Sequence, residues 1–244
     1  MRRVNSSPAF RPLTVTAHTP TGFASGDPWS PAIDGIMAWS FMRKKLGADF
    51  GTNLDLHPVE GLPLEVISHE GLWWYLAGIP ETSEVLHQRY KHFHRRFNSV
   101  DAEKWFQGRR VETAMGPHKN LRKPHLVTTC ASVSWKVVVD PVEIERLVQQ
   151  VPFIGSGHSR GLGMVARWEV SDGFEGSIRR AVPVAYAEEH GIRGTLSMHA
   201  IRPPKHIPEN SVMCVLPGLL PEFTVPVVND GFPVGDRKAR GAMS

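Results

Sequence analysis

The hydrophobic and polar positions in the first fifty residues predict one strand followed by one helix. Residues 13–18 (LTVTAH) alternate and are rich in β-branched side chains, which is typical of a half-buried strand. Residues 33–46 (IDGIMAWSFMRKKL) repeat their apolar positions with the period of an α-helix. We expect Ser30 to cap this helix, with Pro31 in its first turn and Gly47 after its end.

Further along, the pattern predicts a hairpin and then a long basic segment. Residues 62–68 and 72–77 are typical of two strands joined by a turn at residues 69–71 (HEG). We interpret residues 81–98 as a basic helix and residues 105–123 as a basic, partly extended loop.

The second half of the chain predicts a strand, a helix, a loop and another strand. Residues 133–139 are expected to form the strand, and residues 141–150 a short helix with Asp140 as its cap. Residues 163–170 predict a strand directly after a glycine-rich loop. From residue 173 onward, prolines divide the chain into short extended pieces.

This order of elements predicts an α+β fold, an elaborated ferredoxin-like (RRM-like) βαββαβ domain with a basic insertion. Proteins of this topology commonly bind RNA on the exposed face of their sheet. The parts we expect are residues 10–80 as the first part of the core, 81–130 as a thumb-like basic insertion, 131–172 as the second part of the core with the glycine-rich loop, and 173–244 as an extended, proline-rich C-terminal segment.

The composition is that of an ordinary globular protein. Hydrophobic residues make up 41% of the 244, and no run approaches the roughly 18 consecutive apolar residues that a membrane span needs. The basic N-terminus leads into no apolar signal core, and Cys130 and Cys214 are the only cysteines. We therefore expect a cytoplasmic protein with reduced thiols and no membrane contact.

The positive charge is concentrated in one segment. The net charge is +4, yet residues 87–125 hold ten lysines and arginines against three acidic residues. The rest of the chain is therefore slightly acidic. A basic segment on a near-neutral body is typical of a polyanion binder, and the alternative is a solvated helix face.

Residues 155–163 (GSGHSRGLG) form the glycine-rich loop. Glycines permit positive φ and expose backbone N–H groups, and successive bare N–H groups form a concave anion site. Arg160 would add a charge-assisted contact to a phosphate, and His158 would stack on a base or hydrogen-bond a backbone oxygen. The alternative is a helix-to-strand turn without a ligand. The candidate RNA-binding residues of the loop are Gly155, Gly157, His158, Ser159, Arg160, Gly161 and Gly163.

Two commoner phosphate loops do not fit these residues. A Walker loop needs Gly-Lys-Ser/Thr at the start of a helix, whereas this loop leads into a predicted strand. A dinucleotide-binding loop needs a strand before it and a helix after it, which is the reverse of the order here.

Four stretches resemble one known group of proteins. Residues 154–170 (IGSGHSRGLGMVARWEV) resemble the glycine-rich signature of the CRISPR-associated RAMP superfamily, whose members are ferredoxin-like RNA binders. Residues 27–39 (DPWSPAIDGIMAW) resemble the opening helix of the type IV member of its Cas-five group, and residues 116–124 (GPHKNLRKP) resemble that group's segment before the penultimate strand. Residues 134–154 are similar as well. The resemblance covers roughly residues 10–170.

This resemblance implies a non-catalytic subunit of a type IV CRISPR ribonucleoprotein that caps the 5′ handle of the CRISPR RNA (crRNA). The implied partners are crRNA, Cas-seven-like backbone subunits and a large or Cas-eight-like subunit, with target DNA as a further possible contact. No cofactor is expected. The basic insertion would be a thumb that grips the handle or the neighbouring duplex, and its candidate RNA-binding residues are Arg89, Lys91, Arg95, Arg96, Arg109, Arg110, Lys119, Arg122 and Lys123.

The alternative function is that of a metal-independent crRNA-processing endoribonuclease of the same superfamily. His18 and His158 are then the candidate catalytic residues. A metal site is not expected, because no His-Glu-x-x-His or Cys-x-x-Cys motif occurs and we place His92 and His94 on opposite sides of a helix. In residues 73–75 (WWY) we expect one tryptophan in the core and the other at a contact surface.

Overall fold

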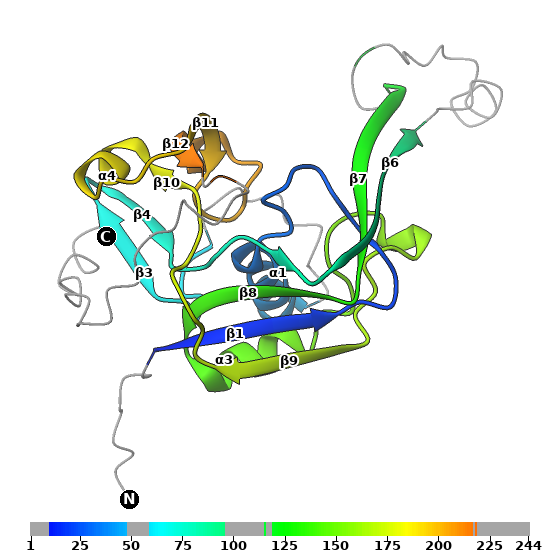
Figure 1. Cartoon of the computed structure of the whole chain (residues 1–244), viewed down its shortest axis with the longest axis horizontal. Helices are drawn as coiled ribbons and strands as arrows, with labels where there is room; N and C mark the ends of the chain where they lie inside the picture. The colour runs from blue at the N-terminus through cyan, green and yellow to red at the C-terminus, as the bar shows by residue number, and fades with distance from the viewer. Residues whose placement is uncertain (1–9, 48–58, 96–114, 116–118, 217, 219–244) are drawn as a thin grey trace, which may run out of the picture.

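The computed structural model describes residues 10–47, 59–95, 115, 119–216 and 218. Over these residues the protein is a mixed α/β structure whose strands pair in antiparallel sheets (Figure 1). The main sheet has the strand order β5-β8-β1-β9. Its strands are β1 (Arg11–His18), β5 (Glu81–Thr82), β8 (Ser132–Val139) and β9 (Arg167–Asp172). The strands predicted at 13–18 and 133–139 are confirmed, whereas the one predicted at 163–170 begins only at Arg167.

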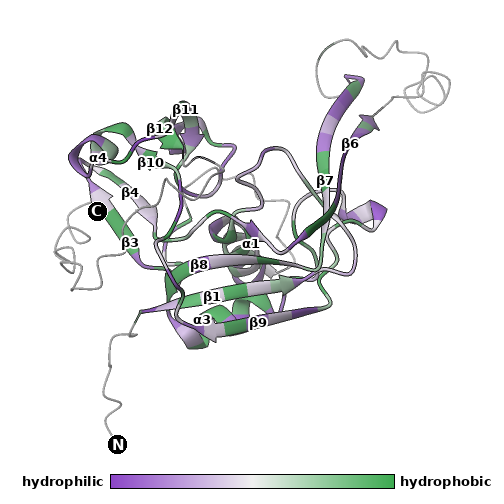
Figure 2. Cartoon of the chain, in the orientation of Figure 1, coloured by the Kyte–Doolittle hydropathy of each residue, from purple (hydrophilic) through white to green (hydrophobic). Residues whose placement is uncertain are grey.

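One face of the main sheet is buried beneath two helices. Leu13, Val15 and Ala17 alternate with polar residues along β1 and are at most 1% exposed, and Figure 2 shows this alternation along β1. The helices α1 (Ile33–Leu46) and α3 (Pro141–Val148) cover the face of the sheet on which Leu13, Val15 and Ala17 lie, and they contribute to the same apolar core. The α1 helix has the predicted bounds.

The two helix caps differ in how well they were predicted. Asp140 caps α3 as expected, because its carboxylate accepts hydrogen bonds from the N–H groups of Val142 and Glu143. The expected Ser30 cap of α1 is wrong, since Ala32 occupies that position. The hydroxyl of Ser30 instead donates to the carboxylate of Asp27, and this hydrogen bond belongs to the loop before the helix.

The basic helix predicted at residues 81–98 is wrong. Most of this segment is strand β6 (Val85–Arg95), which pairs with β7 (Leu121–Cys130) in a long hairpin. The other edge of β7 pairs with β2 (Phe23–Ser25). Most of residues 85–95 are polar, so their hydropathy pattern favours neither the 3.6-residue period of a helix nor the two-residue period of a strand. Their pairing with the distant residues of β7 decides the structure.

The C-terminal lobe, residues 177–216, is more regular than predicted. It contains β10 (Val182–Pro183), α4 (Val184–Glu189), β11 (Thr195–Ala200) and β12 (Ser211–Leu216), with the sheet order β10-β12-β11. The predicted hairpin at residues 62–77 is confirmed as β3 (Val66–His69) and β4 (Leu72–Tyr75). Trp74 joins β4 to the apolar core of this lobe and is 0% exposed, whereas Trp73 is half-buried beneath the guanidinium of Arg202.

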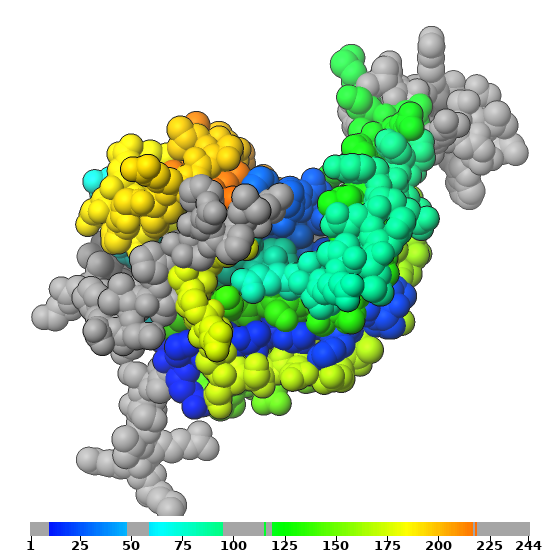
Figure 3. Space-filling model, viewed as in Figure 1, coloured from blue at the N-terminus to red at the C-terminus, as the bar shows by residue number. Residues whose placement is uncertain are grey.

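Two parts of the molecule rise from the main sheet. Figure 3 shows the C-terminal lobe and the β6–β7 hairpin at opposite ends, with the surface of the N-terminal residues between them. Among the residues that the structure describes, no helix combines the length and apolar character that crossing a membrane requires.

The indole of Trp135 anchors this core. It is 0% exposed and its Nε1–H donates to the carbonyl oxygen of Pro31 at 2.8 Å. We expect Trp135→Ala to lower the free energy of unfolding by about 3–5 kcal/mol. Val142→Ala, on the exposed face of α3, should change it by less than about 0.5 kcal/mol. Urea denaturation of both variants checks the difference.

Candidate nucleic-acid interface

The glycine-rich loop packs against the segment around β2. The N–H of Ser156 donates to the carbonyl oxygen of Ala24 at 2.8 Å, and the N–H of Gly163 donates to that of Gly22 at 2.9 Å. The loop also closes on itself, because Ile154 N–H donates to the carbonyl oxygen of Gly163 at 2.8 Å. It is thus a compact turn fixed to its neighbour.

The four glycines take the positive φ angles that the sequence predicts, between 72° and 80°. Two of them also allow close backbone approach: a Cβ on Gly155 would collide with the carbonyl of Ala24, and one on Gly163 with the carbonyl of Ile154. The space around Gly161 is open. Gly155 therefore lets the loop approach β2, and Gly163 lets the loop close on itself.

Hydrogen bonds within the chain occupy part of the expected row of bare N–H groups. The amides of Ser156, Arg160, Gly161, Leu162 and Gly163 all donate within the chain, and residues 158–160 form a single 3-10 turn. These amides cannot cradle a phosphate while they hold the loop together. The positive charge that this loop offers comes mainly from the Arg160 side chain.

Arg160 joins the loop to the hairpin. Its guanidinium carbon lies 4.3 Å from the centroid of the Phe93 ring on β6, a cation–π contact that keeps the charge at the surface. The arginine itself is exposed. The sequence predicted Arg160 as a contact residue but gave no sign of its aromatic partner.

His125 lies beneath this contact, and the sequence analysis missed it. It is 8% exposed, its Nδ1 lies 2.9 Å from the hydroxyl of Ser156, and its ring centroid lies 4.5 Å from that of Phe93. Burial lowers the pKa of His125, and the positive charges of Lys123 and Arg160 lower it further. The imidazole is therefore neutral at pH 7. The residues that contact His125 come from distant segments of the chain, so no local sequence motif predicts its role.

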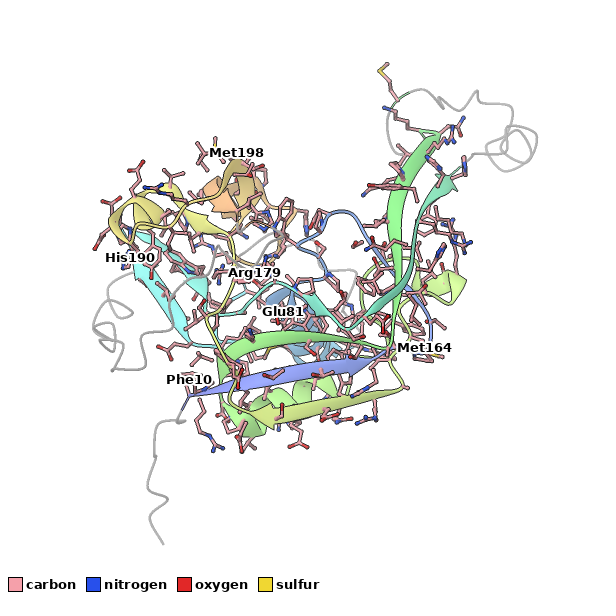
Figure 4. All side chains as sticks on the ribbon, viewed as in Figure 1. Phe10, Glu81, Met164, Arg179, His190 and Met198 are labelled. Carbon is pink, nitrogen blue, oxygen red and sulfur yellow. The ribbon has the colours of Figure 1, made fainter. Side chains whose placement is uncertain are left out.

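Strand pairing sorts the basic residues of the hairpin onto two faces. Lys91 is opposite His125 and Phe93 is opposite Lys123, so these side chains share the face that contacts the glycine-rich loop. Arg89 is on that face too, two residues before Lys91. Arg89, Lys91 and Lys123 are all exposed. Figure 4 shows side chains along the length of β6 and β7, with Met164 near the foot of this hairpin.

The remaining predicted RNA contacts are not all in this group. Arg122 is paired with His94 and therefore faces the other side of the hairpin. Arg95 is opposite Leu121 at the end of β6, and Lys119 is an exposed residue just before β7. The predictions for Arg96, Arg109 and Arg110 lie outside the described residues.

The two histidines predicted for a nuclease are tied to different neighbours. His18 ends β1, where its Nε2 lies 2.9 Å from a carboxylate oxygen of Glu169. His158 contacts the carbonyl oxygen of Gly155 through Nε2 at 2.7 Å and stacks on Phe153. The placement of His92 and His94 on opposite sides of a helix is wrong: they lie on one face of β6, with ring centroids 6.4 Å apart.

A pocket of about 650 Å³ opens beside this interface. Its walls come from β2, the loop before α1, α1, the first half of β7, the start of the glycine-rich loop with the residues before it, and the loop after β11. The basic residues that line the pocket are Arg43, Lys123, His125, His158 and Lys205. Asp27 is an acidic residue in the same wall.

No protein-family model matches the chain, and no curated protein is significantly similar to it. Within the described residues, no three histidine, cysteine or acidic side chains gather as a metal site would require.

The glycine geometry generates a test of how the loop is held. We expect Gly163→Ala to destabilise the protein by about 2 kcal/mol or more, because the new Cβ meets a backbone carbonyl at positive φ. Gly161→Ala has the same φ strain but open space, and should cost about 1 kcal/mol. Equal losses in thermal denaturation would contradict the steric argument.

Proposed function

We propose that the protein is a non-catalytic RNA-binding subunit of a type IV CRISPR ribonucleoprotein. It would hold the 5′ handle of the crRNA and contact Cas-seven-like backbone subunits and a large or Cas-eight-like subunit, with target DNA as a further contact. The observation that carries the proposal is the contact of Arg160 with Phe93. It joins the glycine-rich loop, which resembles the signature of the RAMP superfamily, and the basic hairpin, which would be the thumb that this resemblance implies, into one cationic surface.

The sheet supports a ferredoxin-like arrangement as part of this proposal. Along the chain the main-sheet strands and their helices follow the order β1, α1, β5, β8, α3, β9. In the sheet β1 lies between β8 and β9, with β5 at the far edge. A βαββαβ unit with both helices on one face has this order. The β6–β7 hairpin then stands where an inserted thumb would.

Electrostatics favours a nucleic-acid backbone as the ligand. Arg89, Lys91 and Lys123 share one face of the hairpin with the Arg160 contact. Exposed cations on a protruding hairpin can each neutralise a phosphate and release counterions. Such binding is salt-dependent and largely indifferent to sequence, and it positions the nucleic acid on the protein.

A second candidate, a metal-independent endoribonuclease, has one observation in its favour. The neutral His125 lies in the pocket wall with Lys123, and a neutral imidazole can take a proton from a 2′-hydroxyl while a lysine stabilises the developing negative charge. This candidate would use His125 rather than the predicted His18, whose side chain pairs with Glu169.

RNA binding tests the proposed function. We expect the full chain to bind single-stranded repeat RNA, with log Kd depending linearly on log salt concentration. Arg160→Ala should reduce the magnitude of that slope by about 0.7, the value for one phosphate contact on a single strand. Arg146→Ala removes an exposed arginine of α3 and should leave the slope unchanged. Fluorescence anisotropy from 50 to 300 mM salt measures both, and equal slopes in all three proteins would remove Arg160 from the interface.

Cleavage separates the two candidates. The proposed subunit leaves repeat RNA intact on denaturing gels in the presence of EDTA. Cutting at one position that disappears in His125→Ala would establish the nuclease instead. In that case the rate should fall as the pH drops below the lowered pKa of His125, because protonation removes the base.

A further inference from the structure

We propose that the pocket beside the interface binds one unstacked nucleotide of the RNA, with its base against Trp39 and its phosphate among Arg43, Lys123 and Lys205. This inference rests on the proposed function and names the ligand of a part of the site that the sequence did not indicate. The volume of about 650 Å³ lies within the range of small-molecule sites, so it suits a single nucleotide and not a duplex.

The walls of the pocket match the two halves of a nucleotide. Ile36, Trp39 and Phe153 supply apolar and aromatic surface. The cations come from three separate elements: Arg43 from the end of α1, Lys123 from β7 and Lys205 from the loop after β11. Aromatic surface beside phosphate-binding cations is how proteins hold bases of single-stranded RNA.

Trp39 is the residue on which the proposal depends most. Its helix buries Ile33, Met37 and Ser40 in the core, yet Trp39 remains 37% exposed on the pocket side. The guanidinium of Arg43, one helical turn later, lies 5.1 Å from the centroid of the indole. The arginine lies over one face of the indole, so the base would stack on the other face, next to a charge that suits phosphate.

Lys205 brings the C-terminal lobe into the site. Its ammonium lies 3.7 Å from the carboxylate of Asp34, which is almost fully buried in the first turn of α1. Asp34 lines a smaller neighbouring pocket that Lys205 also lines, so the ion pair holds Lys205 at the boundary between the two pockets. An ammonium group has three donors, which leaves donors for a phosphate. Asp27, the acidic residue in the wall, already accepts from the N–H of Trp29 and the hydroxyl of Ser30.

The test compares ligands that have or lack the base. Each of the four nucleoside 5′-monophosphates, ribose 5-phosphate and inorganic phosphate is titrated into the full chain by calorimetry. We expect at least one nucleotide to bind about tenfold more tightly than ribose 5-phosphate, the effect of stacking one base. Trp39→Ala should abolish that difference, and Trp39→Phe should retain most of it. Lys205→Ala should weaken nucleotide and ribose 5-phosphate alike, whereas Lys44→Ala, a neighbouring lysine outside the pocket wall, should change neither.

Circular dichroism checks that the variants fold. Equal affinity for nucleotides and ribose 5-phosphate, or unchanged nucleotide affinity in Trp39→Ala, overturns the inference. Repeat-RNA binding of the same proteins keeps the two proposals apart. If RNA binds through Arg160 while nucleotides ignore Trp39, only the pocket proposal fails. If nucleotides bind at Trp39 but repeat RNA does not bind, the proposed function fails.

Discussion

Backbone hydrogen bonds between the glycine-rich loop and the segment around β2 fix the position of the whole interface. Ser156 and Gly163 donate to the carbonyls of Ala24 and Gly22, and β2 in turn pairs with β7 of the hairpin. The loop, β2 and the hairpin base therefore form one connected unit. A side chain at 155 would force the loop away from the carbonyl of Ala24, and one at 163 would disrupt the loop's own closure at the carbonyl of Ile154, so both glycines are sterically required.

In this arrangement side chains, more than backbone N–H groups, supply the groups that could bind an anion. Because five of the nine amides of residues 155–163 are used internally, these five cannot contribute to a nest of bare N–H groups. It instead delivers Arg160 to the ring of Phe93 and a hydroxyl to His125. The loop resembles a phosphate-binding loop in sequence, but here it holds Arg160 and Ser156 in place. The cations on the hairpin supply most of the positive charge of the interface.

Local signals predicted the elements that depend on nearby residues. The strand at 13–18, the helix at 33–46 and the Asp140 cap follow from patterns within a few positions, and the structure confirms them. The β6 strand was mistaken for a helix because only its pairing with β7 distinguishes the two. The pocket was beyond prediction for the same reason, since Trp39, Lys123 and Lys205 are brought together only by the folded chain.

The hairpin and the pocket would contribute different kinds of binding energy. Attraction between phosphates and the exposed cations of the hairpin is strong at low salt and is progressively lost as counterions compete. Stacking on a half-exposed indole depends on apolar contact and is little affected by salt. A ligand that uses both is attracted over a long distance by the hairpin and held in one register by the pocket. The connection through β2 maintains a fixed spacing between these two contacts, which under the proposed function would give the interface a means of selecting an RNA end over RNA in general.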